Sequence, residues 1–188
     1  LRGYAYYHIL MTCGPAILVG DEIFESNLDG PAYNTYRATY DETVEYICSE
    51  LETAAAYLPL KASIAQFERP TKGAAYALIA RLRLHAASPL FNGTSTARLY
   101  FGNWKRTYDK AYYINQNYSE EKWALAAAAC KRVIDMNVYE LFTVSKDQNT
   151  PQLPAGVPTE NFPNGAGGID PFKSYSHMFT GDEPFKNN

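Results

Sequence analysis

Apolar residues recur at alternating spacings of three and four along four stretches of the chain, and this period predicts amphipathic α-helices. The expected helices cover residues 1–12, 40–58, 71–88 and 119–137. None of them is expected to be stable alone, because isolated helices of this length are marginal in water. Mutual burial of their apolar stripes stabilises them, by roughly 1.5–3 kcal/mol for each large aliphatic side chain.

Residues typical of helix ends bound these stretches. Gly14 follows the first helix and Pro59 stops the second. Residues 39–42, Thr-Tyr-Asp-Glu, form a capping box, in which the Thr oxygen and the Glu carboxylate satisfy free N–H groups. Thr71 and Ser119 are the expected caps of the third and fourth helices.

The apolar stripes indicate which helices pack together. The second helix has the stripe Val44, Ile47, Leu51, Ala54 and Leu58. The third has Ala74, Ala75, Leu78, Ile79, Leu82 and Ala86. The fourth has Trp123, Ala126, Ala127, Cys130, Val133 and Ile134. Because alanine lets two helices approach closely, we expect the third and fourth to pack on each other along much of their length.

Two long connections interrupt the helical pattern, at about residues 13–38 and 89–118. Compact domains normally use short links, and the second connection is too rich in aromatic residues to be disordered. Residues 143–188 are dominated by Pro, Gly and Asn, which is typical of long ordered loops. We therefore expect a helical scaffold over residues 1–142 with these two insertions, followed by a loop-rich segment, 143–188.

Composition and charge narrow the function. The net charge is −3, with no basic stripe, which argues against a nucleic-acid partner. No stretch approaches the ~20 apolar residues that a membrane-spanning helix needs. The three cysteines are widely spaced and form neither a zinc pattern nor a disulfide framework.

The sequence contains no motif for catalysis, a metal or a cofactor. The histidines His8, His85 and His177 are far apart, and those within helices are more often packed or surface residues than general bases. Neither a GxSxG nor an HExxH pattern occurs. The acidic pairs are adjacent in sequence and do not face each other, so residues such as Asp41 and Glu42 are better explained as first-turn charges. We therefore expect no catalytic residue and no cofactor.

Four segments resemble the SusD/RagB family, the surface nutrient-binding lipoproteins of Bacteroidetes-type bacteria. They are LRGYAYYHILMTCG, YDETVEYICSELETAAAYLP, RPTKGAAYALIARLRLHAASPLFNG and WALAAAACKRVIDMNVYEL. The third is the most specific, because the family has Arg-x-Thr-Lys-Gly-Ala-Ala and Ala-Ser-Pro at matching places. The first departs from the family in having Cys13 where Tyr precedes the glycine.

The resemblance covers Leu1 to about Leu141, a central part of a family member. It implies a mainly all-α fold of tetratricopeptide-like helix hairpins with long, aromatic-rich insertions. It also implies a non-catalytic protein for nutrient uptake that binds oligosaccharide and delivers it to a SusC-like TonB-dependent transporter. The implied location is the extracellular face of the outer membrane, through a lipid anchor upstream of Leu1 and outside this stretch.

Aromatic residues are the candidates for ligand contact. The 16 tyrosines outnumber the 9 phenylalanines and 2 tryptophans, and a Tyr ring offers an apolar face with a polar tip. For Trp123 and the helical tyrosines Tyr4, Tyr6, Tyr7, Tyr46, Tyr57 and Tyr76 we expect packing roles. The candidates in the insertion and tail are Trp104, Tyr100, Tyr108, Tyr112, Tyr113, Phe162 and Tyr175.

Three alternatives remain open from the sequence. Aromatic platforms also suit peptides, so a peptide-binding member of the same family is possible. A tetratricopeptide-like scaffold for a protein partner would have short links between its helices, which the long insertions argue against. A helical glycoside hydrolase would need two carboxyl groups facing each other across a cleft.

Overall fold

The four expected helices are present in the computed structural model, which describes residues 1–27, 29–66 and 68–180. They are α1 (Arg2–Cys13), α2 (Tyr40–Tyr57), α3 (Lys72–Ala87) and α5 (Glu120–Asp135), each within two residues of the predicted bounds. The described residues also contain α4 (Ser95–Phe101), α6 (Pro171–Thr180) and two 3-10 turns, η1 (Gly30–Tyr33) and η2 (Ile64–Gln66). Across these residues there are isolated β-bridges but no sheet, which confirms the mainly helical fold.

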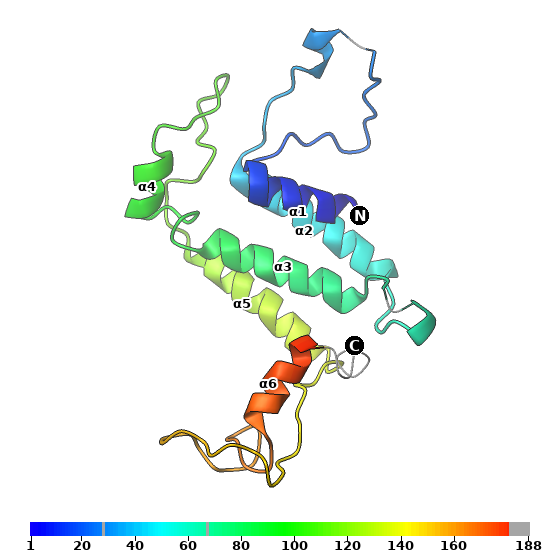
Figure 1. Ribbon diagram of the computed structural model, residues 1–188. Coiled ribbons are helices and arrows are strands. Elements are labelled where there is room, and N and C mark those ends of the chain that lie inside the picture. The colour runs from blue at the N-terminus through cyan, green and yellow to red at the C-terminus, as the bar shows by residue number, and fades with distance from the viewer. Residues whose placement is uncertain (28, 67, 181–188) are drawn as a thin grey trace. The chain divides into compact units, whose positions relative to one another are not determined.

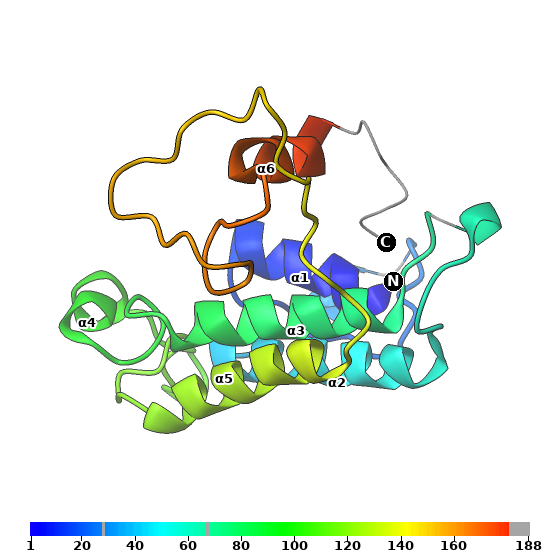
Figure 2. The same ribbon diagram turned by 90° about the horizontal axis from the view of Figure 1, so that it is seen from below.

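The long helices form two antiparallel hairpins. α1 packs on α2, α3 packs most extensively on α5, and α3 also packs on α2 to join the hairpins. Figure 1 shows that both insertions leave the bundle at the same end, and both views show α3 and α5 side by side (Figures 1 and 2). The predicted pairing of the helices is confirmed. No helix among the described residues is both long and apolar enough to cross a bilayer.

The chain divides into two compact units. The first contains Leu1–Leu60 and Pro70–Met136, and the second contains Lys61–Arg69 and Asn137–Asn188. In the second unit, Ser145 pairs with Ile169, and the buried Asp170 accepts hydrogen bonds from Thr150 Oγ1 and the N–H of Lys173. The predicted boundary after residue 142 stays a prediction, because compactness alone does not define a domain that folds independently.

The core of the first unit lies between α1, α2 and α3. From α2 it takes Val44, Ile47 and Leu51, as the stripe predicts. α3 contributes Ile79 and Leu82, and α1 adds three residues. Those are Tyr6, Tyr7 and Leu10.

α5 is more exposed than its sequence predicts. Of its residues only Ala126 is buried, while Ile134 is 73% exposed and Trp123 and Ala127 are also exposed. The predicted burial of these three residues is wrong. Because α5 packs mainly on α3, only one narrow side of α5 is covered by the rest of the first unit. The same correction applies to Ala74 of α3.

Two tyrosines expected to pack are instead at the surface. Tyr4 and Tyr57 are exposed, whereas Tyr6 and Tyr7 are buried as expected. Tyr57 is the last residue of α2, where the helix has run past its neighbours in the core. Helical position alone therefore does not assign a tyrosine to the core.

The sequence pattern did not predict α4 and α6. α4 begins after Thr94, whose hydroxyl accepts a hydrogen bond from the N–H of Ala97. α6 lies in the tail, which was expected to contain few regular elements. Both helices are short, so neither spans enough turns to give a clear helical period.

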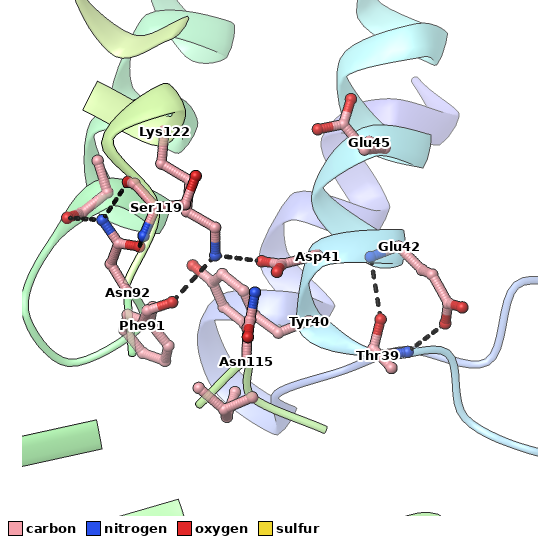
Figure 3. A network of polar contacts seen from close by, with 12 residues as sticks. Thr39, Tyr40, Asp41, Glu42, Glu45, Phe91, Asn92, Asn115, Ser119 and Lys122 are labelled. Carbon is pink, nitrogen blue, oxygen red and sulfur yellow. Dashed lines mark hydrogen bonds and ion pairs between the residues drawn. The ribbon is translucent and has the colours of Figure 1, made fainter. Parts of the chain in front are cut away.

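Asn92 joins the end of α3 to the start of α5. Its side chain is fully buried; Nδ2 donates to the carbonyl of Ser119 at 2.9 Å and to that of Ala87 at 3.4 Å, and Oδ1 accepts from the N–H of Ser119 at 2.9 Å (Figure 3). The backbone of Ser119 is thus held by Asn92, and its side chain makes no capping bond, contrary to expectation. Gly93 is at φ 60°, and a Cβ there would overlap the backbone of Asn117.

Replacing Asn92 tests this join. We expect Asn92→Ala to lower the free energy of unfolding by about 2–3 kcal/mol, because it leaves partly buried backbone groups of Ser119 unpaired and empties a fully buried site. Urea denaturation of the purified protein measures the change. The control is Asn103→Ala, an exposed position in the same insertion, which should stay within about 0.5 kcal/mol of wild type. Equal losses in the two variants would contradict the role of Asn92.

Candidate functional site

The start of α2 is fixed by the predicted capping box. The N–H of Glu42 donates to Thr39 Oγ1 at 3.2 Å, and the N–H of Thr39 donates to Glu42 Oε2 at 2.6 Å (Figure 3). The capping box is confirmed, and so is the first-turn placement of Asp41 and Glu42. This arrangement holds Asp41 at the end of the bundle from which the insertions leave.

Lys122 connects three parts of the first unit. Its Nζ donates to Asp41 Oδ1 at 2.6 Å and to the carbonyl of Phe91 at 3.1 Å, so α5, α2 and the second insertion share one ammonium group (Figure 3). The side chain of Lys122 is 14% exposed and that of Asp41 is 36% exposed. Solvent therefore meets the carboxylate of this pair more than the ammonium group.

Residues 104–113 form a hairpin that is fastened to the start of α2. The N–H of Arg106 donates to the carbonyl of Ala111, and the N–H of Tyr113 donates to that of Trp104. The buried guanidinium of Arg106 donates to Glu42 Oε2 at 2.9 Å and to both carboxylate oxygens of Asp109. Such charge-assisted, two-pronged contacts fix direction as well as position.

A row of aromatic rings connects the hairpin to the bundle. Tyr40 and Phe91 stack with centroids 4.4 Å apart, Phe91 and Phe101 follow at 6.1 Å, and Trp104 and Tyr113 lie 4.7 Å apart. Phe101 and Trp104 link the two groups at 6.2 Å. Trp104 and Tyr113 therefore help to pack the insertion onto the bundle.

His85 is engaged in this packing. Its Nδ1 lies 2.7 Å from the hydroxyl of Tyr40, and its ring lies 4.7 Å from that of Phe91. Burial lowers the pKa of His85, which favours the neutral ring as acceptor of the Tyr40 proton. A packing role accounts for this histidine.

The other insertion aromatics lie closer to solvent. Tyr100 and Tyr108 are exposed, and Tyr112 is 38% exposed with Lys105 Nζ 4.4 Å from its ring centroid. The ring of Tyr108 lies 4.3 Å from that of Tyr36 in the first insertion. Tyr36 was not among the predicted residues, and the two insertions meet at this contact.

Tyr112 lines a hollow of about 440 Å³, which we call the Tyr112 pocket. The lining residues are Thr39, Asp41, Tyr112, Asn115, Gln116 and Asn117. A second hollow of about 260 Å³, also lined by Asp41 and Asn115, adjoins it and reaches Glu45, Arg83, Glu121 and Lys122. The Tyr112 pocket combines one ring with amide, hydroxyl and carboxylate groups.

The amide segment of this pocket is held in place by the protein. Ile114 is fully buried, and Asn115 Oδ1 accepts from the N–H of Asn117 at 2.9 Å. Gln116 donates from Nε2 to the carbonyl of Ile114 at 2.7 Å, and Arg98 Nε donates to the carbonyl of Gln116 at 3.2 Å. A segment already held in this way needs little ordering when a ligand binds.

Of the seven predicted aromatics, Tyr112 alone lines this pocket. Phe162 and Tyr175 belong to the second unit, where both are exposed and Tyr175 lies 5.2 Å from the ring of Phe179. The polar residues that line the pocket were not predicted from the sequence. Three consecutive residues with amide side chains, 115–117, lie among the tyrosines of the insertion and could have indicated them. The ion pair of Asp41 with Lys122, 81 residues away, has no signal in the sequence.

The chemistry of the pocket suits a polyhydroxylated ligand. A ring face packs against C–H groups, and amides and carboxylates bond to hydroxyls. Among the described residues no group of three or more His, Cys, Asp or Glu side chains is arranged to hold a metal ion. The fold and this pocket define a helical scaffold with a polar, aromatic hollow at its insertion end.

Comparison with known proteins finds similarity to SusD-like proteins. A family model described as "Starch-binding associating with outer membrane" (SusD-like_3) matches residues 1–84. The solved structure "BT4246" is 27% identical with a TM-score of 0.66, over 85% of this chain and 28% of that chain. A SusD-like protein (BF3747) from Bacteroides fragilis NCTC 9343 shares the fold at 20% identity and a TM-score of 0.50, over 75% and 20% of the two chains.

The first 84 residues therefore match a SusD-like family model, as the helical motifs predict, and these solved structures share the fold of the chain. The chain spans less than a third of the length of these solved structures. No curated protein matches it.

The Glu42–Arg106–Asp109 contacts predict loss of stability in acid. The N–H of Thr39 lowers the pKa of Glu42 and Arg106 adds to this, while Arg106 lowers the pKa of Asp109. Because both pKa values are depressed in the folded state, the stabilisation is complete above the ordinary values of 4.5 and 3.8 and is lost as the pH falls through the folded values. Unfolding midpoints measured from about pH 6 to pH 2 should therefore fall.

Substituting Glu42 should reduce this acid dependence. Glu42→Gln removes one of the two carboxylates, so its midpoint should change less with pH than that of wild type. Glu140→Gln, an exposed change outside these contacts, serves as the control and should keep the wild-type slope. An unchanged slope in Glu42→Gln would contradict this account.

Proposed function

We propose that this chain is part of a non-catalytic cell-surface protein that binds oligosaccharide nutrients and delivers them to a SusC-like TonB-dependent transporter. The family's description as starch-binding supports the ligand class. Its association with the outer membrane supports the location. The lipid anchor and the location on the extracellular face of the outer membrane are part of this proposal.

The Tyr112 pocket carries the proposal. It brings one partly exposed ring together with the side chains of Asp41, Asn115, Gln116 and Asn117. A sugar ring has C–H faces that pack on an aromatic side chain and hydroxyl rims that bond to amides and carboxylates. Specificity in small-molecule sites commonly comes from a few such polar groups around an apolar surface.

A peptide-binding function is the second candidate, and a different hollow favours it. A hollow of about 410 Å³ lies among α2, α3 and α5, and Ile79, Leu125 and Ala129 line it. The ion pair of Arg132 with Glu52 also borders it. An apolar surface bordered by paired charges suits a peptide side chain better than a sugar hydroxyl. Substitution of the exposed Ala128, which lines this hollow alone, tests this candidate, because Ala128→Arg should block peptide binding and leave sugar binding intact.

Truncating Tyr112 tests the main proposal. We expect Tyr112→Ala to weaken oligosaccharide binding by the full-length protein roughly tenfold, because the stacking surface is lost. Titration calorimetry with a panel of soluble oligosaccharides measures the dissociation constants. Tyr57→Ala, an exposed tyrosine at the other end of α2, is the matched control and should bind as wild type. Equal binding by Tyr112→Ala and wild type would reject this pocket.

Transporter delivery requires a separate assay. Tagged full-length protein isolated from outer membranes should bring a SusC-like transporter with it. Tyr112→Ala should retain this partner while binding oligosaccharide more weakly, since a stacking ring is not expected to form the protein contact. Recovery of the protein without any TonB-dependent transporter would contradict the delivery step while leaving oligosaccharide binding intact.

A further inference from the structure

Acidic side chains outnumber basic ones around the Tyr112 pocket. Among the described residues that line it, Asp41 is the one that carries a charge. The adjoining hollow adds Glu45 and Glu121 on the acidic side and Arg83 and Lys122 on the basic side. Each of these two cations already has a carboxylate partner, because Arg83 Nη2 donates to Glu45 Oε2 at 2.7 Å and Lys122 donates to Asp41.

The Asp41–Lys122 pair presents its negative partner to the pocket. Lys122 is the less exposed of the two, and the carbonyl of Phe91 accepts a second of its protons at 3.1 Å. Within the described residues, Lys122 engages Oδ1 of Asp41, so Oδ2 retains its lone pairs for ligand hydroxyls. Asp41 lines both hollows, so a ligand in either of them lies close to this carboxylate.

Lys105 is the cation that contacts the ring of the pocket. Its ammonium group lies over the Tyr112 ring, 4.4 Å from the centroid, and it is not among the lining residues. A sugar that stacks on the open part of the ring therefore meets Asp41 and the amides. A carboxylate or sulfate on the Asp41 side of the pocket would lie near a like charge, and Lys122, the cation beside it, already donates to Asp41 and to the carbonyl of Phe91.

We propose that Asp41 is a specificity-determining residue that makes the Tyr112 pocket selective for neutral oligosaccharides over acidic ones. This inference rests on the proposed oligosaccharide-binding function. A neutral sugar donates its hydroxyl protons to the carboxylate, whereas an acidic sugar pays for like-charge repulsion and for stripping water from its own anion. Rejection of the wrong ligand by an unfavourable charge is a common source of specificity.

The experiment compares each acidic oligosaccharide with its own carboxyl-reduced, neutral form. Both forms share chain length and linkage, so the ratio of their dissociation constants isolates the charge. We expect the full-length wild-type protein to bind the neutral form roughly tenfold more tightly at low salt. The ratio should shrink as salt is raised, because the pocket is open to solvent.

Asp41→Asn should remove this preference. The amide keeps an oxygen that accepts from Lys122, so the join between α2 and α5 retains a hydrogen bond while Lys122 loses its compensating charge. The ratio should fall to about one or favour the acidic form. Asp41→Glu keeps the charge and should keep the wild-type ratio of dissociation constants. This variant therefore distinguishes an effect of charge from an effect of local unfolding.

Asp135→Asn is the matched control, since Asp135 pairs with Lys131 at the other end of α5. It removes one negative charge from an exposed Lys–Asp pair within α5 and should leave the ratio unchanged. Equal or tighter binding of acidic forms by wild type, or an unchanged ratio in Asp41→Asn, would overturn the inference and leave oligosaccharide binding standing. If neither the acidic nor the neutral form of any oligosaccharide binds, both the proposed function and this inference are rejected.

Discussion

The ammonium group of Lys122 is the point on which the insertion end of the bundle depends. It is largely covered, and a covered ammonium group is tolerated only when acceptors replace its water. Asp41 supplies the charge and the carbonyl of Phe91 supplies a second oxygen, and these groups come from α2 and the second insertion. The start of α5 therefore takes its place relative to α2 through one shared hydrogen-bonding centre, although the two helices share little apolar contact.

In the first unit, apolar side chains provide stability, and polar side chains fix the position of the second insertion. Val44, Ile47 and Leu82 give the helices their stability by burial, without fixing where a loop must lie. Asn92 and Arg106 do the opposite, because their hydrogen bonds are directional and each satisfies specific partners. The insertion is thus held at defined positions, and the pocket segment between these anchors stays open to ligand.

The sequence predicted the helices because their period and caps are local. Residues 39–42 form the expected capping box, and the stripe of α2 is buried nearly as predicted, with Ala55 in the core in place of Ala54. The spacing of apolar residues predicts which residues share a helix face. It does not predict whether another element covers that face, and Ile134 is exposed for this reason. The same limit applies to Tyr57.

The candidate site was predictable only in its aromatic part. Tyr112 was found because it stands in an aromatic-rich insertion. Its partners Thr39 and Asp41 come from a helix start more than 70 residues earlier, where local capping already explains both residues. Contacts across such distances depend on how the hairpins fold back, and a single sequence carries no local signal for them. This is also why Tyr36 and Tyr108 gave no sign of their contact.

The two roles of Asp41 constrain how this pocket can change its ligand. Asp41 holds Lys122 and also faces the hollow, so altering its charge changes both the join and the selectivity. The Tyr112 side chain anchors no helix, and its visible partner is the exposed Lys105. Substitution at Tyr112 can therefore alter ring stacking with little effect on the frame. Changing the preferred ligand charge requires a compensating change at Lys122, because an ammonium group left without its carboxylate would weaken the contact between α2 and α5.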